Sequence, residues 1–110
     1  MAALHFKFEI NQSFLGYPGH PITVPRGEVD YKRLESEQLH QGEFTVIFPR
    51  GERLTAKMVH GDAGYGPFYQ LKITGEDRNV PRYVDAGRSV FVLLVRMNGQ
   101  NYAILEQVAL

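Results

Sequence analysis

The chain has 110 residues, a usual length for one domain, and 12 Lys and Arg balance 12 Asp and Glu, so its formal net charge is zero. This balance disfavours a broad electrostatic grip on nucleic acid or on a membrane, although a local basic face stays open. The absence of cysteine excludes disulfides and thiolate metal sites, and the lack of a secretion leader or a long apolar run predicts a single cytoplasmic domain, 1–110, without membrane segments.

The first part of the chain predicts two strands separated by a long loop. Leu4–Ile10 alternates apolar and polar residues, which is the pattern of a half-buried strand. Asn11–Pro21 contains two glycines and two prolines and is predicted to be irregular, although it carries the bulky Tyr17 and His20. A short extended run, Ile22–Val24, follows.

Glu28–Gln41 is the segment that predicts a helix. Its bulky residues recur at roughly helical spacing, Asp30 is placed to cap the helix N-terminus, and Gly42 is placed to end it. Acidic and basic residues nearly balance along this segment. We therefore interpret it as a solvated face over an apolar stripe, not as a recognition helix.

The rest of the chain predicts strands separated by turns. Asn98-Gly99 is a strong hairpin signal, and Pro81 makes Val80–Val84 an edge strand or coil. This pattern favours a barrel or a sandwich, and we expect a mainly β fold, a small open or pseudo-barrel of about seven strands with one short helix at an end. The predicted strands are Glu43–Phe48, Leu54–His60, Phe68–Thr74, Ser89–Met97 and Tyr102–Glu106.

Leu54–Thr74 is predicted to be two strands joined by a long glycine-rich loop. The segment His60–Pro67 is too long for a two-residue hairpin turn. Its three glycines allow a partner to come close to the backbone. We expect this loop to display His60, Asp62, Tyr65 and Tyr69.

Signals for catalysis and for metal binding are weak. The four histidines include no i, i+4 pair and no His-x-His pair, so a metal site would have to be assembled in space. No serine lies in a nucleophile elbow, and the glycines of the central loop lack the lysine and the helix of a phosphate-binding loop. We expect no cofactor, no metal and no catalytic residue.

Several polar side chains suit contacts with nucleic acid. Gln70 and Lys72 are predicted to share one strand face, Lys57 lies on the partner strand, and Arg78, Asn79 and Arg82 form a basic and amide cluster. Gln, Asn and Arg can make two-point contacts with base edges, whereas Lys and Tyr serve phosphates. The alternative interpretation of these residues is a solvated sheet face and turn.

Three longer segments carry a family resemblance. PITVPRGEVDYKRL (Pro21–Leu34) looks like an extended run and helix start, FTVIFPRGERLTAKMV with PFYQLKI looks like a meander with an arm, and VDAGRSVFVLLVRMNGQNYAILE (Val84–Glu106) looks like a closing hairpin. Together they resemble the B3-like DNA-binding pseudobarrels, which include plant transcription-factor domains and specificity domains of bacterial restriction endonucleases. Arg88 departs from the family's frequent Asp, and the Gly-Asp-Ala-Gly-Tyr-Gly stretch has no residue-by-residue match.

The resemblance implies a double-stranded DNA-binding domain without catalysis of its own. Two arms, by position Leu15–Thr23 and Lys57–Lys72, would enter one major groove, with lysines on phosphates and arm tips on bases. It also implies the specificity domain of a restriction system, with a nuclease domain or another subunit as protein partner. The residues expected to contact DNA are Tyr17, His20, Lys57, His60, Tyr65, Tyr69, Gln70, Lys72, Arg78 and Asn79.

Two other function classes stay open. A protein–protein adaptor or inhibitor of a small β-barrel type would scatter the basic residues and gather Phe14, Leu15, Tyr17 and Tyr65 into one exposed patch. A small-molecule-binding barrel or an enzyme would instead show a deep pocket lined by Tyr65, Tyr69 and His60.

Overall fold

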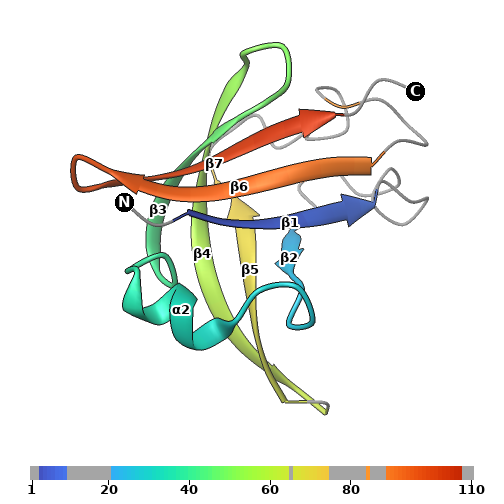
Figure 1. Ribbon diagram of the computed structural model, residues 1–110, viewed down its shortest axis with the longest axis vertical. Helices are drawn as coiled ribbons and strands as arrows, with labels where there is room; N and C mark the ends of the chain where they lie inside the picture. The colour runs from blue at the N-terminus through green and yellow to red at the C-terminus, as the bar shows by residue number, and fades with distance from the viewer. Residues whose placement is uncertain (1–2, 10–20, 65, 75–83, 85–88, 108–110) are drawn as a thin grey trace.

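A computed structural model describes residues 3–9, 21–64, 66–74, 84 and 89–107, and in it one seven-stranded sheet curls into a nearly closed barrel (Figure 1). The strand order is β1-β6-β7-β3-β4-β5-β2, and every neighbouring pair is antiparallel except the parallel pair β3–β7. The mainly β barrel with one short helix is confirmed. Its elements are β1 (Ala3–Glu9), β2 (Ile22–Val24), α2 (Tyr31–Ser36), β3 (Gly42–Ile47), β4 (Arg53–Ala63), β5 (Gly66–Ile73), β6 (Ser89–Met97) and β7 (Gln100–Gln107).

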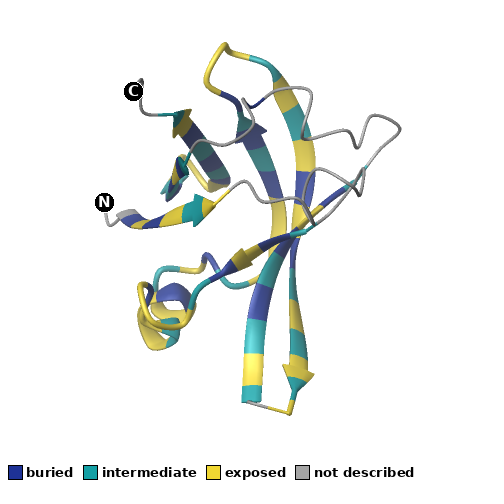
Figure 2. Ribbon diagram, turned by 90° about the vertical axis from the view of Figure 1, so that its right-hand side faces the viewer, coloured by how far each residue is buried: buried dark blue, intermediate teal, exposed yellow. Residues whose placement is uncertain are grey.

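Alternation along the strands places the core inside the barrel (Figure 2). Buried residues recur at every second position in β3, β5, β6 and β7, as the period-two pattern predicted. The largest fully buried side chains come from strands on both sides of the barrel and from the helix, so one core serves the described chain. They include Phe6, Phe44, Phe48, Leu34, Leu71, Leu94 and Leu105.

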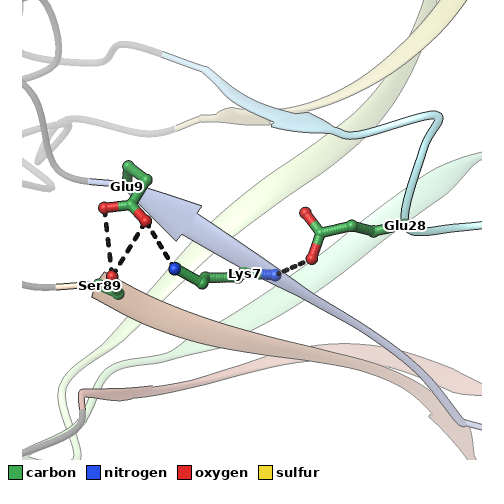
Figure 3. Close-up of polar contacts among 4 residues, drawn as sticks. All are labelled: Lys7, Glu9, Glu28 and Ser89. Atoms are coloured by element: carbon green, nitrogen blue, oxygen red, sulfur yellow. Dashed lines mark hydrogen bonds and ion pairs between the residues drawn. The ribbon is translucent and has the colours of Figure 1, made fainter.

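One seam of the barrel is left unsealed, because β1 and β2 form the two edges of the sheet and no described residue of one pairs with the other. A carboxylate from the turn after β2 reaches the β1 edge: the backbone N–H of Lys7 donates to Glu28 Oε1 over 3.2 Å (Figure 3). On β1 itself, Lys7 Nζ lies 3.0 Å from Glu9 Oε1, and the Ser89 hydroxyl donates to the same carboxylate. The hydrogen bond from Lys7, and then that from Ser89, lower the pKa of Glu9.

The helix is shorter than the predicted span Glu28–Gln41. Asp30 caps it as expected, accepting from the Lys32 N–H at 3.0 Å. The helix ends because Gln38 takes a left-handed conformation with φ of 60°, and the N–H groups of Gln38 and Leu39 donate to carbonyls one turn back. The end predicted at Gly42 is therefore wrong, since Gly42 instead opens β3 with φ of 89°.

The prediction of a long central loop is also wrong. β4 continues to Ala63 and β5 begins at Gly66, so the two strands pair almost to the tip. The sequence is misleading here because glycine and proline usually interrupt strands. At Gly61 the Phe68 ring of β5 covers the position where a Cβ would stand, so the missing side chain makes room for the aromatic ring across the strand pair.

Of the other predicted strands, Ile22–Val24 and Ser89–Met97 are reproduced in full, and the rest differ from the observed ones by one or two residues at each end. The Asn98-Gly99 hairpin is confirmed, with φ of 53° and 75° at the two turn residues. Ile10, the loop 11–20 and most of Val80–Val84 lie outside the described residues. Val84 itself is buried in the core.

Among the helices of the described chain, none has both the length and the apolar character needed to cross a membrane.

Candidate nucleic-acid interface

β4 and β5 extend beyond the barrel as a two-stranded arm. The pairing of β3 with β4 reaches Met58, and the pairing of β2 with β5 reaches Tyr69. Past these points lie residues 60–64 and 66–68, which we call the arm. Among the described residues, the arm pairs only within the β4–β5 hairpin, from His60↔Tyr69 to Ala63↔Gly66. Figure 1 shows the two strands continuing well past helix α2. Within the part of the chain that the structure describes, no further strand pairs with either edge of the arm.

Two lysines lie directly opposite each other at the base of the arm. Lys57 of β4 pairs with Lys72 of β5, both point to the outer face of the barrel, and both are exposed. Like charges directly opposite on neighbouring strands destabilise a sheet. Glu43 pairs with Lys57 from the β3 side, but no described carboxylate lies within 4 Å of either ammonium group. The pair forms a small concentration of positive charge without an ion-pair partner among the described residues.

Hydroxyl and amide groups surround this lysine pair on the outer face. Gln70 lies two residues from Lys72 on the same strand face, and its Nε2 donates to Thr23 Oγ1 of β2 over 3.3 Å. On the other side, Thr55 pairs with Thr45 of β3. These groups can donate to phosphate oxygens or contact base edges.

Tyr69 faces the core and not a loop. Its side chain is 6% exposed, its ring packs edge-to-face against Tyr31 at 4.9 Å between centroids, and its hydroxyl donates to Glu35 Oε1 over 2.9 Å. Burial, and then the hydrogen bond to Glu35, raise the pKa of Tyr69 to about 12. The expectation that a loop displays Tyr69 is wrong, and the residue instead fastens helix α2 to the base of the arm.

His60 lies in β4 on the opposite face from the lysines. It pairs with Tyr69, and the two ring centroids are 5.1 Å apart. His60 is exposed, as is Asp62 further along the arm. The structure thus brings Lys57, Gln70 and Lys72 together on one face and places His60 on the other.

Five of the residues expected to contact DNA lie outside the part of the chain that the structure describes. They are Tyr17, His20, Tyr65, Arg78 and Asn79.

Arg26 braces the arm, although no motif or pattern in the sequence singles it out. Its guanidinium carbon lies 5.7 Å from the centroid of the Tyr31 ring. The same guanidinium stands beside Gly66, where an added Cβ would approach Arg26 Nη1 to 3.0 Å. Arg26 follows β2 by only two residues, so this contact joins the turn after β2 to the start of β5. The position of Arg26 depends on the β2–β5 pairing, which no local pattern reveals.

Metal-binding groups do not gather in the described residues: no three His, Cys, Asp or Glu side chains there are placed to hold an ion.

Comparison of the chain with protein-family models, with curated proteins and with solved structures finds no match.

Proposed function

We propose that this domain binds double-stranded DNA through the outer face of β4 and β5 and the arm that continues from them. The observation that carries the proposal is the Lys57–Lys72 cross-strand pair, which concentrates positive charge at the base of a projecting two-stranded arm. A phosphate between the two ammonium groups would relieve their repulsion and would gain two charge-assisted hydrogen bonds.

The arm suits a major groove, because a two-stranded β-ribbon is narrow enough to enter one. In this arrangement Lys57 and Lys72 hold the backbone, while Gln70 and the arm tip lie nearest the base edges. The zero net charge of the chain agrees with a small number of local phosphate contacts and disfavours a broad basic surface.

We also propose that the domain is related to the B3-like DNA-binding pseudobarrels that its sequence resembles. A B3-like pseudobarrel would use a strand-pair arm of this kind together with the segment Leu15–Thr23, most of which lies outside the described residues. As a specificity domain of a restriction system, the chain would select the DNA site and leave cleavage to a nuclease domain. The support for this family relation is that a strand-pair arm extends from an open barrel.

A fluorescence-anisotropy titration with random-sequence duplexes tests the proposal. Wild-type protein should bind at low salt, and affinity should fall steeply as salt rises. Lys57→Ala with Lys72→Ala should weaken binding roughly tenfold. The double variant should also reduce the salt slope by about two, because two fewer phosphate charges are neutralised by the protein.

Arg50→Gln is the matched control, because it removes one positive charge at the β3–β4 turn, at the opposite end of β4 from the arm (Figure 1). Arg50 lies beside Glu52, with 3.6 Å between Nε and Oε2. Absence of duplex binding by wild-type protein at low salt would overturn the proposed function.

A protein contact is the second candidate function, and an apolar outer face of β6 and β7 favours it. Phe91 is 44% exposed, and it lines a shallow hollow of about 270 Å³ together with Leu93, Ile104 and His5. A photo-crosslinking residue at position 91 tests this function. Capture of one specific protein there, with no capture from position 57, would favour it.

A further inference from the structure

A polar groove opens where the parallel strands β3 and β7 begin. It encloses about 530 Å³ and lies against the β6–β7 turn. Its lining is almost free of large apolar side chains, and Gly42 and Gly99 leave its walls open. The polar side chains that line it are Gln41, Glu43, Thr45, Thr55, Arg96, Gln100 and Asn101.

Arg96 is held in this groove by a chain of hydrogen bonds. Arg96 Nη1 donates to Asn101 Oδ1 over 2.9 Å, and Asn101 Nδ2 donates to the Gln38 carbonyl over 3.1 Å and to the Gln41 carbonyl over 3.5 Å. Asn101 is 6% exposed and is the buried polar side chain of the described core. The guanidinium is therefore anchored through Asn101 to the turn that follows helix α2.

The anchored guanidinium has donors to spare. A guanidinium carries five N–H groups, and an amide oxygen such as that of Asn101 leaves the positive charge uncompensated. No described carboxylate lies within ion-pair distance of Arg96, although Glu43 lines the same groove. A pre-positioned, uncompensated arginine in an open polar groove is the arrangement that binds an oxyanion.

The groove borders the lysine pair, although neither Lys57 nor Lys72 lines it. Thr55 of the groove precedes Lys57 by two residues on the same face of β4, and Glu43 of the groove pairs with Lys57 across β3 and β4. The Thr45 and Thr55 hydroxyls and the Gln100 amide add neutral donors of the kind that serve phosphates. A phosphodiester chain lying over Lys57 and Lys72 can thus extend into the groove.

We propose that the Arg96 groove is a phosphate site that binds the DNA backbone beyond the arm, with Arg96 as the main contact and Glu43 as a group that limits affinity. This inference rests on the proposed function, because it names a further part of the same interface. The site would also accept a phosphate from a smaller molecule, so the experiment separates the two sources.

Two charge variants with opposite expected effects form the test. Arg96→Gln should weaken duplex binding about five- to tenfold and should reduce the salt slope by about one. Glu43→Gln should strengthen duplex binding several-fold, because the phosphate then meets no carboxylate in the groove. A reduced salt slope at equal thermal stability separates a phosphate contact of Arg96 from a structural role. Glu43→Gln alone does not separate them, because Glu43 also pairs with Lys57. Arg50→Gln again serves as the control.

A titration with inorganic phosphate is monitored by NMR through the Arg96 Nε–H signal. Together with duplex binding, it distinguishes a DNA site from a site for a smaller phosphate compound. Weaker duplex binding by Arg96→Gln supports the site on DNA. Duplex binding that is the same for wild type and Arg96→Gln overturns the inference while the proposed function stands. If no duplex binds but phosphate shifts the Arg96 signal, the proposed function fails and the site belongs to a smaller phosphate compound. If neither occurs, both are overturned.

Discussion

Tyr69 shows how one residue connects the helix to the arm. It lies in β5 opposite His60 of β4, and its hydroxyl reaches Glu35 at the end of helix α2. Because the phenol is buried and hydrogen-bonded to a carboxylate, the folded state favours its protonated form. The residue expected to contact DNA therefore has a structural task that depends on its protonation.

Tyr69→Phe tests this task through the pH dependence of stability. Near pH 8 the variant should lose about 1–2 kcal/mol of unfolding free energy, because Glu35 loses a hydrogen bond. The ordinary tyrosine pKa is 10.0 and the pKa of Tyr69 is about 12 in the folded protein. Unfolding therefore releases a proton between these values, so the stability present below pH 10 is lost as the pH rises toward 12.

Denaturant titrations of both proteins between about pH 8 and pH 12 measure this difference. The stability gap between wild type and Tyr69→Phe should narrow as the pH rises. A gap that stays constant over the range would show that the Tyr69 proton does not contribute.

The buried position of Tyr69 was predictable from the alternation of apolar and polar residues along its strand. Tyr69, Leu71 and Ile73 alternate with Gln70 and Lys72, so the pattern that placed Gln70 and Lys72 on the outer face also placed Tyr69 with the core. The pairing of Arg96 with Asn101 was also predictable, because a two-residue turn at Asn98-Gly99 places the two residues opposite each other. The hydrogen bonds from Asn101 to the helix turn were not, since they join segments far apart in the chain.

At the scale of single elements, helix α2 ends without a glycine. Gln38 occupies the left-handed position that glycine usually fills, and the apolar side chains typical of this motif are supplied by Leu34 and Leu39, both fully buried. A left-handed conformation is unfavourable for a residue with a Cβ. The sequence predicts the helix end at Gly42 because no local signal marks glutamine for this conformation.

Gln38→Gly is expected to stabilise the fold by up to about 1 kcal/mol, because it removes the Cβ strain and keeps the backbone carbonyl that accepts from Asn101. Gly42→Ala, with φ of 89° at the first residue of β3, should destabilise by a similar amount or more. Chemical denaturation of both variants measures the two effects. A loss of stability in Gln38→Gly would mean that the glutamine side chain makes an interaction worth more than the strain.

The arm explains why the sequence of this strand pair resembles that of a loop. Pro67 lacks a backbone N–H, but no third strand of the described chain pairs with this part of β5 and requires that donor. Gly61 likewise leaves space for the Phe68 ring. The glycines and the proline that predict a loop here instead fit a two-stranded ribbon whose edges have no further strand partner among the described residues.

In the barrel as a whole, the seam between β1 and β2 is the place where the sheet does not close. An open strand edge can pair with another chain, and natural proteins protect such edges with charged groups. Glu28 does so here by accepting the Lys7 N–H. The sequence could predict the strands themselves, but not this seam, because the periodic patterns say which face is buried and not which strands are neighbours.

Glu28→Ala should remove the carboxylate that protects the β1 edge of the seam. The Lys7 amide should exchange its hydrogen faster, unfolding free energy should fall by about 0.5–1 kcal/mol, and association between copies should rise with concentration. Glu106→Ala removes the same charge from the outer face of β7 and is the control for amide exchange and unfolding free energy. It does not control association, because Glu106 lines the apolar hollow beside Phe91. Hydrogen exchange by NMR and sedimentation measure these effects; equal exchange of the Lys7 amide in both variants would contradict the assigned role of Glu28.

The strand order has a consequence for how the protein is made. Phe6 of β1 pairs with Val92 of β6, and Val46 of β3 pairs in parallel with Ala103 of β7. During synthesis on the ribosome, β1 and the β7-facing edge of β3 lack the strand partners that they have in the described fold until β6 and β7 emerge. Pairings between distant segments slow folding and prolong exposure of strand edges. The nascent chain can therefore pair β3, β4, β5 and β2 once β5 has emerged, and the barrel should close only after β6 and β7 have been made.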